Sequence, residues 1–277
     1  MKMTGNTILI TGGGSGIGRG LAEAFQALGN TVVIAGRRKA MLEATAKANP
    51  GMEWMTLDIE DAASIQRFAK QAAEKYPKLN VLINNAGIMK LEDLRMVAGT
   101  EVAEKTIAIN LLGPIRLTTA LLPLLRQQPH STMMTVSSGL AFVPLAPTPT
   151  YCATKAAIHS YTQSLRYQLK DTTTEVVELI PPYVATELMG SSAGDPRAMP
   201  LDKFIAEVME ILKTKPDVRE VCVENVGRLR FAAESGHYDA VFKGMNDAMA
   251  TGLHWGGANA RAKARVGPAV NDGLRGT

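Results

Sequence analysis

The fold is decided by one stretch near the amino terminus, Thr7-Ile8-Leu9-Ile10-Thr11-Gly12-Gly13-Gly14-Ser15-Gly16-Ile17-Gly18. Its first five residues are apolar or β-branched, which is typical of a buried strand, and the region after the glycines has helical spacing. Glycines let the backbone approach a ligand closely, and the first turn of a helix offers free amides to an anion. The stretch therefore predicts a strand–turn–helix unit that holds a phosphate, with an ordinary flexible turn as the alternative.

The same alternation of buried runs and helical spacing continues along the chain. Strands are predicted at Thr7–Thr11, Thr31–Ala35, Trp54–Leu57, Val81–Asn84, Thr132–Val136, Val176–Ile180 and Glu220–Glu224. Helices are predicted at Ile17–Leu28, Arg38–Ala48, Ala62–Tyr76, Thr100–Leu125, Tyr151–Leu169 and Leu201–Lys213. Continuous apolar runs indicate strands that are buried on both faces, and strand–helix–strand repetition indicates a parallel sheet. The sequence predicts an α/β chain with a three-layer, doubly wound Rossmann fold, about seven parallel strands and one domain over residues 1–249.

Composition and charge exclude several classes of protein. Hydrophobic residues make up 46% and charged residues 20% of the 277 positions, so the chain is not disordered throughout. No run approaches 18 consecutive apolar residues, so no membrane span is expected. The net charge is +4, but residues 250–277 hold four bases and a single acid, so we predict no basic face and no nucleic-acid partner. This last stretch is predicted to be a flexible basic tail, with a C-terminal lid as the alternative.

Cysteine content and the amino terminus predict a cytoplasmic protein. Cys152 and Cys222 are too few for a disulfide scaffold or a zinc site, and Cys152 is expected to pack in the interior. The apolar run at residues 7–11 is too short for a signal peptide. No metal is expected, because ligand spacing is missing among the histidines, which are His130, His159, His237 and His254.

The second predicted strand indicates which nucleotide would bind. The glycine turn reads Thr-Gly-x-x-x-Gly-x-Gly rather than the commoner spacing of glycines at i, i+2 and i+5, but the same backbone argument applies. The strand ends in Ala35-Gly36-Arg37-Arg38, without the carboxylate that holds the ribose 2′-hydroxyl of NAD. A guanidinium suits a 2′-phosphate. The sequence therefore predicts NADP(H) as the cofactor, with Arg37 as the leading contact to the 2′-phosphate and Arg38 as the second. The alternative is that both arginines are solvated residues at the start of a helix.

Three further residues suggest proton-transfer chemistry. Tyr151 and Lys155 are four residues apart at the start of a predicted helix and share one face. Ser138 follows the fifth predicted strand, and ligands of a parallel sheet bind at the carboxyl ends of its strands. A nearby ammonium, together with the positive ring of an oxidised nicotinamide, is expected to lower the pKa of the phenol. Tyr151 would exchange a proton with a carbonyl or alcohol oxygen, Ser138 would hydrogen-bond that oxygen, and the nicotinamide would carry the hydride.

Over roughly residues 5–225 the sequence resembles the short-chain dehydrogenases/reductases of the ordinary single-domain type. The motifs that carry the resemblance are Thr-Gly-x-x-x-Gly-x-Gly at 11–18, Asp58-Ile59, Asn84-Asn85-Ala86-Gly87, Asn110, Ser138, Tyr151-x-x-x-Lys155, and Pro181 with Thr186. The turn Gly36-Arg37-Arg38, the pair Pro181-Pro182 and residues 200–204 resemble a bacterial group named for D-alanine esterification of teichoic acids. That label describes genetic context more than a substrate.

The resemblance implies roles for individual residues. It implies a catalytic tetrad of Asn110, Ser138, Tyr151 and Lys155, in which the lysine also binds the ribose and the asparagine holds a water. It implies cofactor contacts for Gly12, Ser15, Gly16, Ile17, Gly18, Arg37, Arg38, Asp58, Ile59, Asn85, Ala86, Gly87, Tyr151, Lys155, Pro181, Val184 and Thr186. Pro182 stands where the family usually has glycine, and this second proline removes an amide from the turn and fixes its φ. Long helices commonly pair between subunits in relatives, which implies a homodimer or homotetramer.

The expected activity is reversible, NADP(H)-dependent reduction of a carbonyl on a small or medium substrate. An apolar substrate is expected, because the segment Gly139–Thr150, with Phe142, carries no charge and would wall the cleft. The resemblance puts Met89 and Met189 near the same cleft. A non-catalytic NADP(H)-binding redox sensor is the alternative, although a sensor has no need of the whole tetrad. Epimerisation or dehydration is a third possibility within the family.

Overall fold

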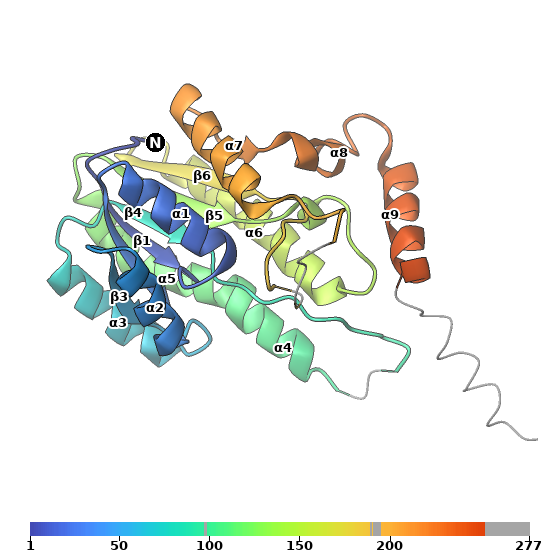
Figure 1. The fold of residues 1–277 in the computed structure, drawn as a ribbon, viewed down its shortest axis with the longest axis horizontal. Helices are drawn as coiled ribbons and strands as arrows, with labels where there is room; N and C mark the ends of the chain where they lie inside the picture. Colours follow the sequence, from blue (N-terminus) through green and yellow to red (C-terminus); the bar gives the residue numbers. More distant parts are fainter. Residues whose placement is uncertain (97–98, 189, 191–194, 253–277) are drawn as a thin grey trace, which may run out of the picture.

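Seven parallel strands form one sheet in the computed structural model, which describes residues 1–96, 99–188, 190 and 195–252. The strands are β1 (Thr7–Thr11), β2 (Thr31–Gly36), β3 (Glu53–Thr56), β4 (Val81–Asn84), β5 (Ser131–Val136), β6 (Thr174–Ile180) and β7 (Glu220–Cys222). Their order across the sheet is β3-β2-β1-β4-β5-β6-β7 (Figure 1). The chain winds outward in both directions from β1 and β4, as in a doubly wound Rossmann fold. The predicted fold class is therefore confirmed.

Helices cover both faces of this sheet. One face carries α1 (Gly16–Ala27), α2 (Lys39–Ala48) and α7 (Leu201–Thr214). The other carries α3 (Ala62–Lys75), α4 (Glu101–Ile107), α5 (Gly113–Arg126) and α6 (Pro149–Gln168). Two more helices follow β7, namely α8 (Gly227–Arg230) and α9 (Tyr238–Gly252), and Figure 1 shows α9 at the margin of the molecule. Three layers result, as predicted.

Successive residues of a strand pack into two separate hydrophobic cores, one on each face of the sheet. Ile8 and Ile10 of β1 pack into the core under α1, α2 and α7, whereas Leu9 packs into the core under α3 and α5. Each of these side chains is almost completely buried. Burial of one such aliphatic side chain contributes about 1.5–3 kcal/mol. The apolar run that the sequence shows in β1 is therefore the result of packing on both faces.

One predicted helix, Thr100–Leu125, is wrong as a single regular element. The structure has α4, then a π-helical turn at Ala108–Leu112, and then α5. Close packing at Gly113 accompanies this turn, because a Cβ atom there would lie 2.6 Å from the carbonyl oxygen of Ile59. The apolar pattern of the stretch has no feature that separates a π-helical turn from the α-helix around it.

The carboxyl-terminal part differs from the prediction in two ways. The predicted seventh strand extends to Glu224, but β7 ends at Cys222 and a short 3₁₀ turn occupies Glu224–Val226. Neither α8 nor α9 is predicted, and α9 includes residues 250–252 of the expected tail. Residues 253–277 lie outside the described residues, as do Met189 and residues 191–194.

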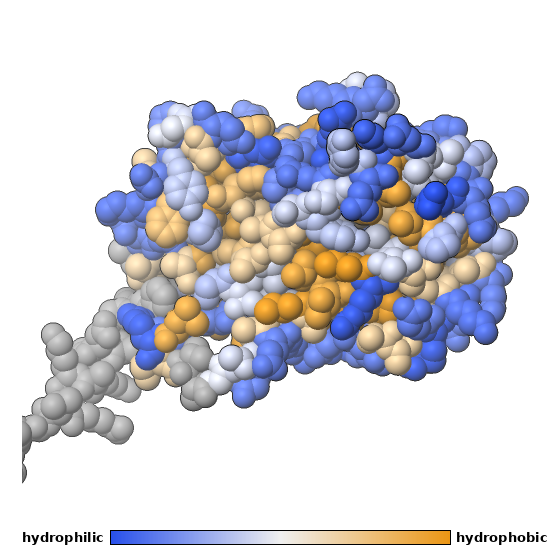
Figure 2. All heavy atoms as spheres, turned by 180° about the vertical axis from the view of Figure 1, so that it is seen from behind, coloured by the Kyte–Doolittle hydropathy of each residue, from blue (hydrophilic) through white to orange (hydrophobic). Residues whose placement is uncertain are grey.

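One helical stretch in the described part of the chain, Glu101–Arg126, is long and apolar enough to cross a membrane by length and composition alone. A core helix meets the same criterion, and Leu117 and Leu121 of this stretch are buried against the sheet. Ile107 and Leu112, in contrast, are exposed. Figure 2 shows apolar residues gathered near the centre of the face opposite to that of Figure 1. Exposed apolar patches of this kind mark interaction surfaces.

Candidate active site

The carboxyl ends of β1 and β4 are tied together by Thr11. Its buried hydroxyl oxygen accepts hydrogen bonds from the amides of Asn85 and Ala86, both at 3.0 Å. The side-chain amide of Asn85 donates in return to the carbonyl oxygen of Thr11 at 2.9 Å. These three bonds fix the loop after β4 against the glycine turn after β1, at the edge where a parallel sheet binds its ligands.

The glycine turn needs glycine for two different reasons. Gly12 and Gly16 have φ values of +70° and +53°, which residues other than glycine rarely adopt. At Gly18 the reason is space, because a Cβ atom would lie 2.5 Å from both the Asn85 Nδ2 and the Gly12 carbonyl oxygen. Ser15, the residue before α1, makes no side-chain cap, and the first turn of α1 holds no acid. The free helix amides therefore fit a phosphate, as a dinucleotide cofactor requires.

Gly18→Ala is expected to destabilise the protein by about 1–3 kcal/mol, because the added methyl group must displace the Asn85 side chain or the backbone of the turn. Urea unfolding at neutral pH measures the loss. Gly36→Ala is the matched control at the end of β2, where a Cβ atom would meet only Leu42, at 3.7 Å. Equal stability of the Gly18 and Gly36 variants would contradict this account of the turn.

The two predicted arginines lie differently with respect to the glycine turn. Arg38 donates from Nη2 to the Ser15 hydroxyl at 2.9 Å, which places its guanidinium on the turn. Arg37 lies 3.9 Å from a carboxylate oxygen of Glu60, after β3. Both side chains are exposed. The residue expected to be the second contact is thus the one that touches the turn in the structure.

The other predicted cofactor residues follow β3, β4 and β6 at the same edge of the sheet. Asp58 and Ile59 follow β3, Asn85, Ala86 and Gly87 follow β4, and Pro181, Val184 and Thr186 follow β6. A Cβ atom on Gly16 would lie 3.4 Å from Thr186 Cγ2, so the loop after β6 meets the glycine turn. Val184 is buried, and it forms an isolated bridge with Met199 that holds this loop against the segment before α7.

Asn110 projects from the π-helical turn onto the loop after β4. Its Oδ1 accepts from the amide of Ile88 at 2.9 Å and its Nδ2 donates to the carbonyl oxygen of Ile88 at 2.8 Å. A longer bond of 3.3 Å reaches the Thr154 hydroxyl on α6. Gly87 adjoins the same side chain, since a Cβ atom there would lie 3.3 Å from Asn110 Oδ1. The asparagine therefore joins β4, α6 and the π-helical turn.

Ser138, Tyr151 and Lys155 come together at the carboxyl end of β5. The Tyr151 side chain lies close enough to Ser138 for that hydroxyl to lower its pKa, and the Ser138 Oγ accepts from the amide of Leu140 at 3.1 Å. The Lys155 Nζ lies 5.6 Å from the centre of the Tyr151 ring and donates to the carbonyl oxygen of Val136 at 2.7 Å. All three side chains are buried. A phenol, a hydroxyl and an ammonium are thus gathered at one point.

The pKa of Tyr151 departs from the sequence expectation. Burial raises it to about 12, and the hydrogen bond from Ser138 offsets only part of that effect. Burial also lowers the pKa of Lys155 to about 8, against the opposing charge of Glu178. For the groups of the protein alone the pKa of the phenol is therefore raised, and not lowered as expected, because loss of hydration is the largest effect on it. The neutral phenol is the form that can donate a proton.

Sequence reasoning missed the contribution of α9 to this site. Tyr151, Met89, Leu145 and Cys152 form one small apolar cluster, and two methionines of α9 pack against it, Met245 and Met249. Asn246 fixes α9 to the segment before α6: its Oδ1 accepts from the Ala146 amide at 2.6 Å and its Nδ2 donates to the Pro144 carbonyl oxygen at 3.1 Å. The four-residue spacing of the methionines was one available signal, and Gly236, two residues before the helix begins, was another.

Comparison with known families and relatives agrees with this geometry. The model of the short chain dehydrogenase family matches residues 6–196. The uncharacterized oxidoreductase DltE of Bacillus subtilis (strain 168) is 40% identical over 253 residues, which cover 89% of this chain and 98% of that protein. The dehydrogenase/reductase SDR family protein 7-like of Drosophila melanogaster is 29% identical and is covered to 73%, over 78% of this chain. The expected likeness to the bacterial group is thereby confirmed.

Solved structures share the same fold. A short chain dehydrogenase from Burkholderia cenocepacia, in complex with NADP, superimposes with a TM-score of 0.75 at 23% identity, over 88% of this chain and 99% of that one. The 3-ketoacyl-(acyl-carrier-protein) reductase from Brucella melitensis, complexed with NADH, gives a TM-score of 0.72 at 26% identity, over 81% and 100%. With its sheet order, its glycine turn and its relatives in agreement, this chain is an oxidoreductase that belongs to the short-chain dehydrogenase/reductase family.

Proposed function

We propose that the protein is an NADP(H)-dependent reductase that acts reversibly on the carbonyl group of a small or medium apolar substrate, with Tyr151 as its acid and base. One observation carries the proposal: the buried Tyr151 hydroxyl lies close enough to Ser138 for that hydroxyl to lower its pKa, and it lies beside Lys155, at the sheet edge that also holds the glycine turn. A binding module has no use for a buried phenol at that point. The proposal therefore favours catalysis over the redox-sensor alternative.

The proposed mechanism uses the chain's own groups for the proton and for positioning. When bound, the nicotinamide supplies or accepts the hydride. Ser138 donates a hydrogen bond to the substrate oxygen as negative charge develops there. Tyr151 donates its proton to that oxygen during reduction and takes one from the alcohol in the reverse direction. Lys155 orients the cofactor ribose and supplies a positive charge beside the phenol, while Asn110 holds the loop after β4 in place.

The preference for NADP(H) is supported by the two arginines after β2. Arg38→Ala is expected to weaken NADPH binding by about 10–100-fold, because a charge-assisted hydrogen bond to a phosphate is worth about 1.5–3 kcal/mol. The effect on NADH should be within about threefold. Quenching of protein fluorescence by each nucleotide measures the two dissociation constants. Arg37→Ala is expected to act in the same direction but less strongly, because Arg37 pairs with Glu60. A wild-type protein that prefers NADH, or an NADPH affinity that is unchanged in both variants, would contradict the assignment.

An apolar substrate is supported by what surrounds Tyr151. Met89, Leu145 and Cys152 form one apolar cluster with the phenol, and Met245 and Met249 of α9 pack against this cluster. Methionine side chains adapt to ligands of different shape. Oxidation of NADPH in the presence of a panel of ketones, aldehydes and keto-esters tests the activity. Tight NADPH binding without turnover of any carbonyl would favour the sensor instead.

Pairing of subunits is part of the same proposal. The exposed apolar residues Val102, Ile107 and Leu112 lie along α4, the π-helical turn and α5, and a second copy of the chain would cover them. We expect a cytoplasmic homodimer or homotetramer. Sedimentation at micromolar concentration measures the mass of the particle, and a monomer would contradict this part of the proposal.

A further inference from the structure

Two carboxylates lie side by side in the sheet, close to the proposed catalytic lysine. Glu178, in the middle of β6, is completely buried. Its partners in the register of the parallel strands are Thr135 on β5 and Glu220 on β7. Like charges that are directly opposite on neighbouring strands destabilise a sheet. A buried pair of acids therefore needs compensating partners.

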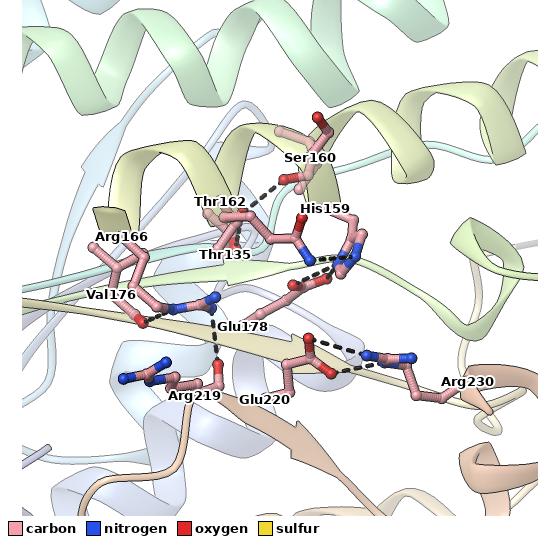
Figure 3. A network of polar contacts seen from close by, with 12 residues as sticks. Thr135, His159, Ser160, Thr162, Arg166, Val176, Glu178, Arg219, Glu220 and Arg230 are labelled. Carbon is pink, nitrogen blue, oxygen red and sulfur yellow. Dashed lines mark hydrogen bonds and ion pairs between the residues drawn. The ribbon is translucent and has the colours of Figure 1, made fainter. Parts of the chain in front are cut away.

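Glu220 and Glu178 are held by different kinds of group (Figure 3). Arg230 donates to both oxygens of Glu220, at 2.7 and 3.3 Å, and so supplies a full positive charge. Glu178 is met by His159 of α6, whose Nδ1 lies 3.0 and 2.9 Å from its two oxygens. The side-chain amide nitrogen of Gln163 lies 3.0 Å from the other ring nitrogen of His159. With Gln163 as the donor there, the imidazole is neutral and donates its Nδ1 proton to Glu178.

A metal site is the other use to which such a cluster could be put. His159, Glu178 and Glu220 bring possible ligand atoms within 4.8 Å of one another. However, the guanidinium of Arg230 already provides the cation that Glu220 needs. A neutral imidazole leaves the charge of Glu178 in place, so the charge of this acid is available to a third group.

Lys155 is that third group. It lies one helical turn before His159 on α6, so both side chains are on the same face of the helix. Its Nζ donates to the carbonyl oxygen of Val136, and Val136 pairs in register with Leu179, the residue after Glu178. Burial lowers the pKa of Lys155, and the charge of Glu178 acts against that loss. The ammonium and the carboxylate thus occupy one buried region between α6 and the sheet.

We propose that Glu178, oriented by His159, is a positioning residue that keeps Lys155 in its ammonium form in the neutral pH range. The role of Lys155 in turnover rests on the proposed function, whereas the coupling between the two charges does not. A buried lysine without a counter-charge would lose its proton and with it the ability to bind a ribose or to act electrostatically on Tyr151.

Other charged and titratable groups face this region from each neighbouring element. Arg166 on α6 donates to the carbonyl oxygens of Val176 and Arg219, and its positive charge also acts on Glu178. On β7, burial and the charge of Glu220 raise the pKa of the Cys222 thiol to about 11, so it is neutral at physiological pH. From α8, Arg230 is shared with Glu234, beyond that helix. Arg166 and Arg230 keep their positive charges and the Cys222 thiol stays neutral at neutral pH, which leaves Lys155 as the group of this region whose pKa lies near 8.

The test measures the pKa of Lys155 directly, by the carbon-13 resonance of its Cε in lysine-labelled protein, with Lys155→Met to assign the signal. Glu178→Gln keeps the size of the side chain and removes its charge. The pKa of Lys155 is expected to fall by about one pH unit or more. Glu178→Asp should restore most of the wild-type value, because it restores the charge. Glu175→Gln, on the same strand but exposed, is the matched control and should leave the value unchanged.

A kinetic measurement separates this inference from the proposed function. The alkaline limb of the kcat/KM profile for NADPH-dependent carbonyl reduction is expected to move to lower pH in Glu178→Gln, by the same amount as the pKa. A Lys155 pKa that is unchanged in Glu178→Gln overturns the inference, whatever the activity. A lowered pKa in a protein that reduces no carbonyl supports the charge coupling and rejects the proposed function. A lowered pKa with an unmoved kinetic profile overturns the positioning role.

Discussion

Tyr151→Phe is expected to reduce NADPH-dependent carbonyl reduction by about 10³-fold, within the range that general acid–base catalysis usually contributes. The substitution removes the proton donor and leaves the ring. Its packing against Met89 and Leu145 is therefore retained, and no cavity is created. The dissociation constant for NADPH should change by no more than about twofold. Steady-state NADPH oxidation with a responsive carbonyl, together with fluorescence titration of the nucleotide, measures both quantities.

Tyr167→Phe is the control for this experiment, because Tyr167 lies on the same helix but is 70% exposed. It should retain full activity. Turnover by Tyr151→Phe within tenfold of the wild-type rate would remove Tyr151 from the mechanism. A large loss of NADPH affinity in the same variant would instead assign the tyrosine to cofactor binding.

Lys155→Met is expected to lower activity. It is also expected to remove the free-energy cost that burial of the Lys155 ammonium imposes on the folded protein. Burial holds the pKa of Lys155 near 8 in the folded protein, compared with 10.5 for an ordinary lysine. Between these two values the unfolded chain binds a proton that the folded chain has lost, so wild-type stability rises with pH in that window. Below pH 8 the full cost of about 3 kcal/mol is present. Methionine has no such cost, although it leaves the Val136 carbonyl oxygen without its donor, which costs about 1–3 kcal/mol.

The pH dependence identifies the titrating group. The stability difference between Lys155→Met and wild type should shift by about 2 kcal/mol between pH 7 and pH 10, in favour of the wild type at the higher pH. Urea unfolding at both pH values measures it. Lys47→Met, at an exposed position on α2, is the control and should show no such shift. A difference that is independent of pH would mean that Lys155 keeps an ordinary pKa in the folded protein.

Much of the sheet could be predicted because its central strands, β1, β4 and β5, are buried on both faces. The bounds of Thr7–Thr11 and Val81–Asn84 are predicted to the residue, since glycine or asparagine on either side of an apolar run leaves little choice of where the strand begins and ends. The loops of the site were also predictable, because the carboxyl ends of parallel strands must meet at one edge. Thr11 and Asn85 meet there through side-chain bonds that could not be read from spacing, although their positions could.

Features that depend on contacts between distant segments were beyond the sequence. Met245 reaches the Tyr151 cluster only because Asn246 binds the backbone of residues 144–146, about a hundred positions earlier. Glu178 is the one acid in the predicted strand Val176–Ile180, and no spacing in the sequence links it to His159. The direction of the Tyr151 pKa was missed for a similar reason, because the extent of burial is a tertiary property.

The π-helical turn has a consequence for the outer surface as well as for Asn110. In an α-helix, the side chains of residues five apart point in directions that differ by about 140°. In a π-helical turn the backbone hydrogen bonds join residues five apart, so their side chains point in more similar directions. Ile107, directly before the turn Ala108–Leu112, and Leu112, the last residue of that turn, are five residues apart and are both exposed. The inserted residue that directs Asn110 inward therefore also aligns two apolar side chains outward. Deleting one residue here would rotate every later position of the helix. One change would then misplace both the residues that pack into the interior and the exposed residues that a second helix would contact.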